Sequence, residues 1–127
     1  MTNEKHGLSA AEWSVMECLW EKAPRTGREA VEWLEERKGW SRSTTLTLLR
    51  RMEAKGAVAC GTENGIHVYT PLLRREEAAG RETDDLLSRV YKGSVSMMMS
   101  AITKKQRLSR EEIDELYEIL RQAEEVE

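Results

Sequence analysis

Apolar residues recur at helical spacing in three stretches of the first half of the chain, covering residues 8–21, 26–39 and 40–56. This period predicts three helices joined by short connections. Each stretch also holds a residue type that caps helix N-termini, namely Ser9, Thr26 and Ser41. After Ser9 and Thr26 a glutamate follows three residues later, which completes a capping box and fixes where those two helices begin.

After residue 56 the period changes from helical to strand-like. Two short strands are predicted at residues 57–60 and 66–70, and Asn64-Gly65 between them is a strong hairpin turn because both residues tolerate positive φ. Three helices followed by a β-hairpin are typical of a winged helix-turn-helix, in which the third helix is the recognition helix and the hairpin is the wing. Winged helices that bind proteins share this order, so it leaves both functions open.

The third predicted helix has two different faces. Thr45, Leu48, Leu49 and Met52 recur at the spacing of a helix that packs on a core. The opposite face carries short hydroxyls and guanidiniums, from Ser43, Thr44, Thr47, Arg50 and Arg51. Short polar groups allow close approach to a DNA groove, and arginine bonds either phosphate or a guanine edge. A solvated helix surface is the alternative interpretation of the same pattern.

From residue 74 onward the chain is again helical and highly charged, with a break at Gly93 and capping residues at Ser94 and Ser109. Its apolar residues form narrow stripes that cannot bury themselves in so short a segment. A second copy of the chain would cover them, so we expect a winged-helix domain at residues 1–73 and a helical dimerisation domain at 74–127. Folding back on the winged helix as a monomer is the alternative. The expected dimerisation residues are Leu86, Val90, Tyr91, Val95, Met98, Met99, Ile102, Ile113, Leu116, Tyr117 and Leu120.

Charge is unevenly distributed along the chain. The formal net charge is −3, yet residues 41–56 carry four basic side chains and one acidic one, whereas residues 109–127 carry two basic and eight acidic ones. A nucleic-acid signal is therefore local and lies on the third helix.

Other classes of protein lack support in the sequence. No apolar run approaches the roughly 20 residues that span a bilayer, and residues 1–7 lack a hydrophobic secretion segment, so we expect a cytoplasmic protein with no membrane partner. Cys18 and Cys60 lie outside any CxxC motif, which favours neither a disulfide nor a metal site. The sequence shows no glycine-rich phosphate loop, no clustered histidine or cysteine and no nucleophile next to a base. We therefore expect neither an enzyme nor a cofactor.

Five segments together resemble the penicillinase-repressor (BlaI/MecI/CopY) family of bacterial winged-helix repressors, and they cover nearly the whole chain from Leu8 to about Leu120. These segments are LSAAEWSVMECLW, WSRSTTLTLLRRMEAKG, IHVYTPL, VYKGS and LSREEIDELYEIL. The resemblance implies an N-terminal DNA-binding domain, a C-terminal dimerisation domain and repression at palindromic operators on double-stranded DNA.

Matching the family's recognition helix position by position implies DNA contacts at Arg42, Ser43, Thr44, Thr47 and Arg51. Arg42 and Arg50 would contact phosphates, whereas Thr44, Thr47 and Arg51 would read base edges. Ser43 stands where the family commonly has a lysine, which implies a different operator or a weaker phosphate contact. The wing tip, residues 62–64, has no basic residue.

Two known induction routes of the family lack their sequence signals here. The Asn-Phe bond that a protease cuts in antibiotic-sensing members falls at Ala101-Ile102, so any regulatory protease is unknown. The metal-binding CxC pair of copper-responsive members is absent from residues 74–127. Met98 and Met99 share a stripe with Val95, so we interpret them as dimer core rather than as a copper site.

The sequence therefore predicts a mainly α protein that acts as a homodimeric, sequence-specific transcriptional repressor. The alternative is a winged-helix module that binds proteins and not DNA.

Overall fold

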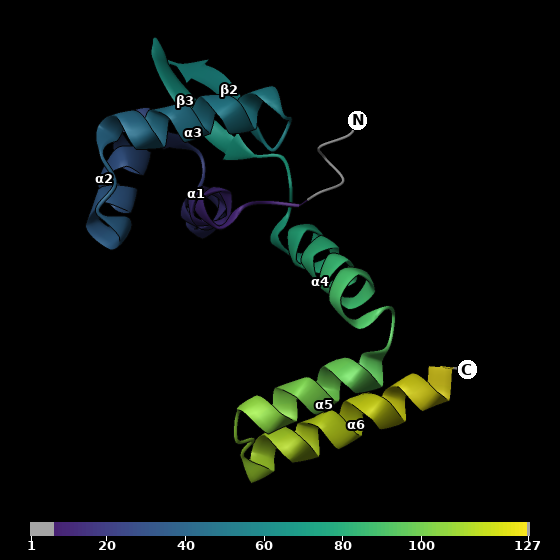
Figure 1. The fold of residues 1–127 in the computed structure, drawn as a ribbon. Coiled ribbons are helices and arrows are strands. Elements are labelled where there is room, and N and C mark those ends of the chain that lie inside the picture. The colour runs from purple at the N-terminus through teal and green to yellow at the C-terminus, as the bar shows by residue number, and fades with distance from the viewer. Residues whose placement is uncertain (1–6, 127) are drawn as a thin grey trace. The chain divides into compact units, whose positions relative to one another are not determined.

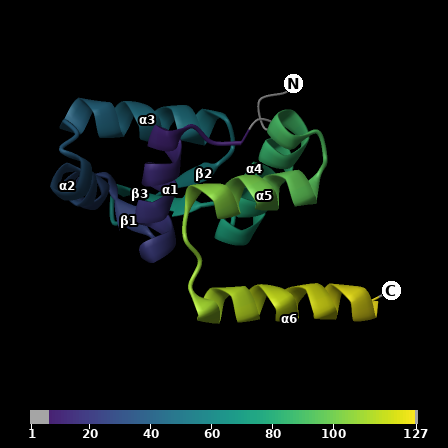
Figure 2. The same cartoon turned by 60° about the horizontal axis from the view of Figure 1, so that its bottom comes forward.

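The computed structural model describes residues 7–126, and its backbone divides into two compact units, the first ending at Asp85 and the second beginning at Leu86. Residues 1–6, on which the expectation about a secretion segment rests in part, lie outside the described residues. The elements of the first unit, in chain order (Figures 1 and 2), are α1 (Ala10–Glu21), β1 (Arg25–Thr26), α2 (Gly27–Lys38), α3 (Arg42–Ala54), β2 (Val58–Glu63) and β3 (Ile66–Pro71). Then follow α4 (Arg75–Tyr91), α5 (Val95–Lys105) and α6 (Arg110–Val126), so the fold is mainly α as predicted.

The predicted capping residues begin the helices of the first unit. The Ser9 hydroxyl accepts a hydrogen bond from the Glu12 amide at 3.1 Å, and the Glu12 carboxylate accepts one from the Ser9 amide at 2.9 Å. Thr26 and Glu29 form the same reciprocal pair at 3.0 and 2.9 Å. Because each pair satisfies two backbone donors that a helix end leaves open, these short sequence signals determine where α1 and α2 start.

The core of the first unit lies among α1, α2, α3 and the hairpin. Its largest fully buried side chains include Met16, Leu19, Leu34, Leu49 and Met52, so each of the three helices contributes to it. Trp13, Trp20, Trp33 and Trp40 are only partly buried and pack around this core. The described residues include no helix with the length and apolar character needed to cross a bilayer.

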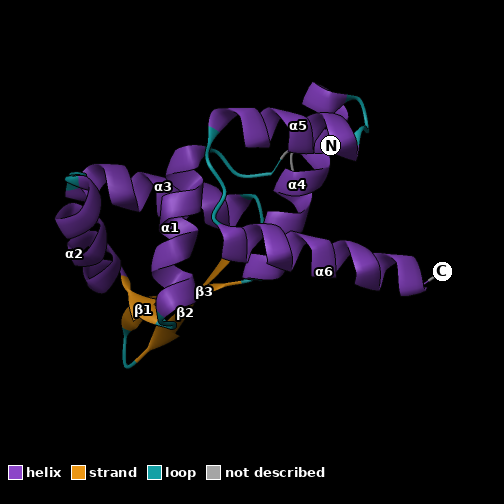
Figure 3. Cartoon of the chain, turned by 90° about the horizontal axis from the view of Figure 1, so that it is seen from below, coloured by secondary structure: helices purple, strands orange, loops and turns teal. Residues whose placement is uncertain are grey.

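The hairpin is longer than predicted and belongs to a three-stranded antiparallel sheet (Figure 3). β2 continues to Glu63, where we had expected a loop from residue 61, and only Asn64 (φ 53°) and Gly65 (φ 79°) form the turn. Both residues have positive φ, as the sequence predicted. The two-residue strand β1 pairs with β3 and gives the order β1-β3-β2, which we had not predicted.

In the second unit the apolar side chains of the described residues remain half-buried or exposed. None of the side chains of α5 or α6 is buried, and Tyr117, Ile119 and Leu120 are 57%, 59% and 64% exposed. An open groove of about 470 Å³ separates the two helices, which Figure 2 shows as distinct rods. It is lined by apolar side chains that include Met99, Ile113, Leu116 and Leu120.

The boundary between the two backbone units falls within α4, and the division into domains at residues 73 and 74 stays a prediction. The first unit extends into α4 as far as Asp85, because Ala78 is buried in the core and the Leu8 amide donates to the Glu82 carboxylate at 3.3 Å.

Candidate nucleic-acid interface

The candidate recognition helix α3 has the two faces that its sequence predicted. Thr45, Leu48, Leu49 and Met52 are buried against the core. All six residues predicted to contact DNA are exposed, namely Arg42, Ser43, Thr44, Thr47, Arg50 and Arg51. The helical period therefore separates the packing face from the polar face, and the polar face is accessible to a large ligand.

The first turn of α3 is fixed by Ser41. Its hydroxyl accepts from the Thr44 amide at 3.2 Å and lies 3.0 Å from the Thr44 hydroxyl oxygen, to which it donates. The rotamer of Thr44 is held in this way before any ligand arrives, since its oxygen already has a partner.

The C-terminal end of α3 is tied to α1 by an ion pair. The Lys55 ammonium lies 3.0 and 3.1 Å from the two carboxylate oxygens of Glu12, whose side chain is almost fully buried. Burial by itself raises the pKa of Glu12, but the hydrogen bond from the Ser9 amide and the Lys55 charge outweigh it, so the pKa is lowered. The pair fixes α3 at the end opposite to Ser41.

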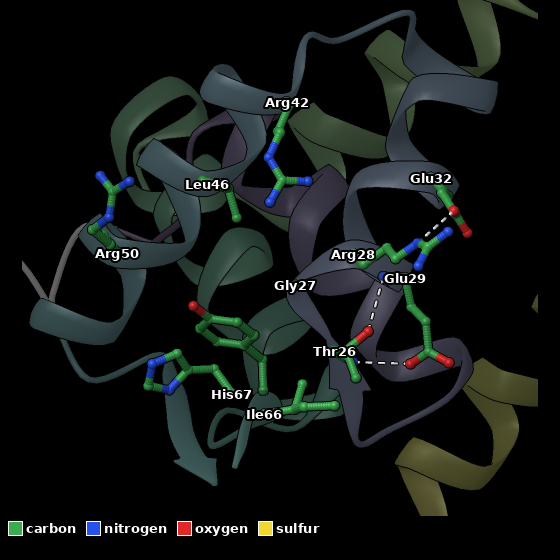
Figure 4. A pocket seen from close by; sticks show the side chains of 11 residues that line it. Thr26, Gly27, Arg28, Glu29, Glu32, Arg42, Leu46, Arg50, Ile66 and His67 are labelled. Atoms are coloured by element: carbon green, nitrogen blue, oxygen red, sulfur yellow. Dashed lines mark hydrogen bonds and ion pairs between the residues drawn. The ribbon is translucent and has the colours of Figure 1, made fainter. Parts of the chain in front are cut away.

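A groove of about 730 Å³ runs between the start of α2, α3 and β3 (Figure 4). Arg42, Leu46 and Arg50 line it from α3, one helical turn apart, and His67 and Tyr69 line it from the wing. Ser43, Thr44, Thr47 and Arg51 are not among its lining residues. The side of α3 that faces away from the core therefore includes an inner row of 42, 46 and 50, which lines the groove, and an outer row of 43, 47 and 51, with Thr44 in neither row.

The groove is also lined by two cationic or titratable residues that were not predicted from the sequence as DNA contacts. Arg28, at the start of α2, lies 3.4 Å from the Glu32 carboxylate in an exposed pair, and His67 projects from β3. The capping box at Thr26 placed Arg28 in the first turn of a helix and so held a usable signal. His67 could be assigned to the groove only once the hairpin register was known.

A contact between two residues of the wing corrects one expectation from the sequence. We expected no nucleophile next to a base, yet the Cys60 sulfur lies 3.7 Å from Nδ1 of His67. The expectation was wrong because these residues come together only through cross-strand pairing. The other thiol, Cys18, is fully buried, and burial raises its pKa to about 11.

Three packed helices, a helix-turn-helix formed by α2 and α3, and a β-hairpin beside an exposed cationic helix face define a winged-helix DNA-binding protein. The model of the family described as "Penicillinase repressor" matches residues 8–122. The chain belongs to the penicillinase repressor family.

Curated relatives agree with this assignment. The methicillin resistance regulatory protein MecI of Staphylococcus aureus (strain N315) is 31% identical over 120 residues, which cover 94% of this chain and 98% of MecI. The penicillinase repressor of Bacillus licheniformis is 33% identical over 113 residues, which cover 89% of this chain and 88% of the relative.

Among solved structures, part of the chain is similar to the Bacillus licheniformis repressor BlaI, whose monomeric form was determined in complex with the blaP half-operator. The TM-score is 0.51 at 31% identity, and the match covers 55% of this chain and 85% of the BlaI chain. The fold, the family and these relatives identify the chain as a DNA-binding transcriptional repressor and not an enzyme.

Proposed function

We propose that the chain represses transcription as a homodimer that binds a palindromic operator in double-stranded DNA, with one α3 helix in each half-site. The observation that carries this proposal is the exposed polar face of α3 next to a groove lined by Arg28, Arg42 and Arg50. Two-fold symmetric winged helices place their recognition helices about one turn of DNA apart, ~34–36 Å.

The two rows of α3 have different roles in this proposal. Arg42 and Arg50 of the inner row contact phosphates, since they lie at a groove whose walls come from α2 and β3. Thr44, Thr47 and Arg51 face away from that groove and read base edges in the major groove, with the threonine methyl groups against thymine and the guanidinium against guanine. Ser43 lies beside them in the first turn of α3. Its short side chain reaches less far toward DNA than the lysine that is common at this position in the family.

Arg28 and His67 extend the phosphate-binding surface beyond α3. Both line the same groove as Arg42 and Arg50, and Arg28 belongs to the first turn of α2, where backbone amides also favour anions. Phosphate contacts of this kind set the position and orientation of the protein on DNA without reading its sequence.

Dimerisation is the proposed role of residues 74–127, with the winged-helix domain at residues 1–73. None of the eleven expected dimerisation residues is buried within one chain; Leu86, Val90 and Val95, for example, are 41%, 45% and 55% exposed. Apolar stripes of this extent are typical of obligate interfaces, which resemble a protein core divided between two chains.

Sequencing the fraction bound from a random duplex library, combined with a salt titration, tests the proposal. A palindromic motif should emerge, and a plot of log affinity against log salt should have a steep negative slope, since each phosphate contact contributes about 0.9. Failure to enrich any motif, together with affinity that does not change with salt, would contradict DNA recognition by α3. Enrichment of a single half-site would agree with DNA binding by α3 but would contradict binding as a homodimer.

A further inference from the structure

The first unit carries a second groove, which shares no lining residue with the one beside α3. Its volume is about 500 Å³, and it is lined from the C-terminal parts of α1 and α2 and from Arg75 at the start of α4. Two indoles, Trp20 and Trp33, form its aromatic walls. The groove is open to solvent, its volume lies within the range of about 300–1,000 Å³ found for small-molecule sites, and it combines aromatic walls with a few charges.

The two indoles are held in fixed orientations. The Trp20 ring nitrogen donates to the Leu73 carbonyl at 2.8 Å, and the Trp33 ring nitrogen donates to the Glu21 carboxylate at 2.8 Å. Trp13 also packs edge-on against Trp20, with ring centroids 5.2 Å apart. Because these rings are already ordered, binding of a ligand that packs beside them costs little additional side-chain entropy.

The cations of this groove are held by the indoles rather than neutralised by carboxylates at close range. The Arg37 guanidinium lies 4.2 Å from the Trp33 centroid, and that of Arg75 lies 5.4 Å from the Trp20 centroid. Their ion pairs, with Glu36 and Glu17, are 3.6 and 3.9 Å long. Charge-assisted hydrogen bonds are about 2.7–2.9 Å, so these pairs leave guanidinium donors available.

Lys38 adds a third cation to the groove. Its side chain is exposed, and in the described part of the chain it forms neither a hydrogen bond nor an ion pair. The lining contains three cations and two carboxylates, and Glu36 outside the lining pairs with Arg37, so Lys38 is the cation of the groove that has no carboxylate partner among the described residues. One such cation matches a monoanion better than a phosphate ester, which carries about −1.5 to −2 charges.

We propose that this groove binds a planar aromatic carboxylate, with the ring against Trp20 and Trp33 and the carboxylate at Arg37 and Lys38. The proposal concerns a surface separate from α3, so its test involves no DNA and is independent of the proposed function.

Isothermal titration of the full chain with naphthalene-2-carboxylate, and with the neutral naphthalene-2-carboxamide as the matched ligand, tests the proposal. The carboxylate should bind once per chain, and the carboxamide should bind about tenfold more weakly because it lacks the charge. In ¹H–¹⁵N spectra the indole signals of Trp20 and Trp33 should shift, whereas that of Trp40 should stay. Equal affinity for the two compounds, or no heat at millimolar ligand, would overturn the proposal.

Two substitutions locate the carboxylate. Arg37→Gln and Lys38→Gln should each weaken binding about tenfold, the effect of losing one charge-assisted hydrogen bond. Both side chains are exposed, so the two variants should stay folded at the temperature of the titration, which thermal unfolding checks. Arg28→Gln removes an exposed cation from the other end of the same helix and should leave affinity unchanged. An equal loss in Arg28→Gln would show non-specific charge attraction and would contradict the site.

Discussion

At the scale of single residues, the side chains that α3 packs into the core are apolar except for that of Thr45. Thr45 is completely buried, and its hydroxyl is the one buried side-chain oxygen or nitrogen among the described residues that has no hydrogen-bond partner. A buried polar group without a partner costs about 1–3 kcal/mol. Thr45 therefore weakens the core that its neighbours Leu48 and Leu49 stabilise.

Thr45→Val should stabilise the protein. Valine keeps the branched shape of threonine and removes the unsatisfied hydroxyl, so the free energy of unfolding should rise by about 1 kcal/mol. Urea unfolding followed by circular dichroism measures it. Thr47→Val, at an exposed position of the same helix, is the matched control and should change stability by no more than about 0.5 kcal/mol. A loss of stability in Thr45→Val would show that the hydroxyl does have a partner.

Arg51 and Arg50 are adjacent in sequence but belong to the outer and inner rows of α3, so their substitutions should differ in kind. Arg51→Ala should weaken operator binding by about 1–3 kcal/mol and relax preference at one base pair per half-site. Arg50→Ala should lower affinity for operator and random DNA to a similar extent and reduce the salt slope by about 1. Fluorescence anisotropy with both duplexes distinguishes them, and equal losses for Arg51→Ala would refute its base-reading role.

At the scale of elements, α3 is held in place at both ends by polar contacts, and the one at its C-terminal end depends on pH. The lowered pKa of Glu12 means that the folded state favours the carboxylate more than the unfolded chain does. Its contribution to stability is therefore fully present above the ordinary value of about 4.5 and is lost as pH falls through the lowered folded value.

Glu12→Gln tests this coupling while keeping the capping box, because glutamine serves in that motif as well. At pH 7 the variant should lose about 1–3 kcal/mol of stability, because Lys55 keeps its charge without a partner. Below about pH 4 the difference from the parent should shrink. Unfolding at a series of pH values measures it, and a difference that stays constant down to pH 3 would contradict the ion pair's contribution.

Elements that are set by neighbouring residues were predictable from the sequence, and those set by distant ones were not. Capping boxes and the Asn64-Gly65 turn involve residues within a few positions, and the structure contains them as predicted. β1 is only two residues long and exists because β3 pairs with it, which no local pattern indicates. The same reason applies to His67, which lines one groove with Arg50, and to the groove lined by Trp20 and Trp33, since tertiary packing creates both.

At the scale of the whole molecule, the apolar faces of α5 and α6 stay uncovered in a single chain. Leu120→Asp should place a charge in the proposed dimer interface and shift the protein to monomer in sedimentation experiments. Full-operator affinity should fall, while binding to an isolated half-site should persist. Glu111→Gln, exposed on the same helix, should leave the dimer intact. A Leu120→Asp variant that remains dimeric would contradict the proposed interface.

The open groove between α5 and α6, which we propose is covered by a second chain, has a consequence for gene control. If operator DNA is bound only by pairs of chains, then below the dimer dissociation constant the amount of active repressor varies with the square of the amount synthesised. Halving the supply of chains would reduce active repressor about fourfold under that condition. A promoter under such control would therefore respond sharply to dilution by cell growth. It would need no proteolytic cleavage of the repressor, no metal binding and no other chemical signal.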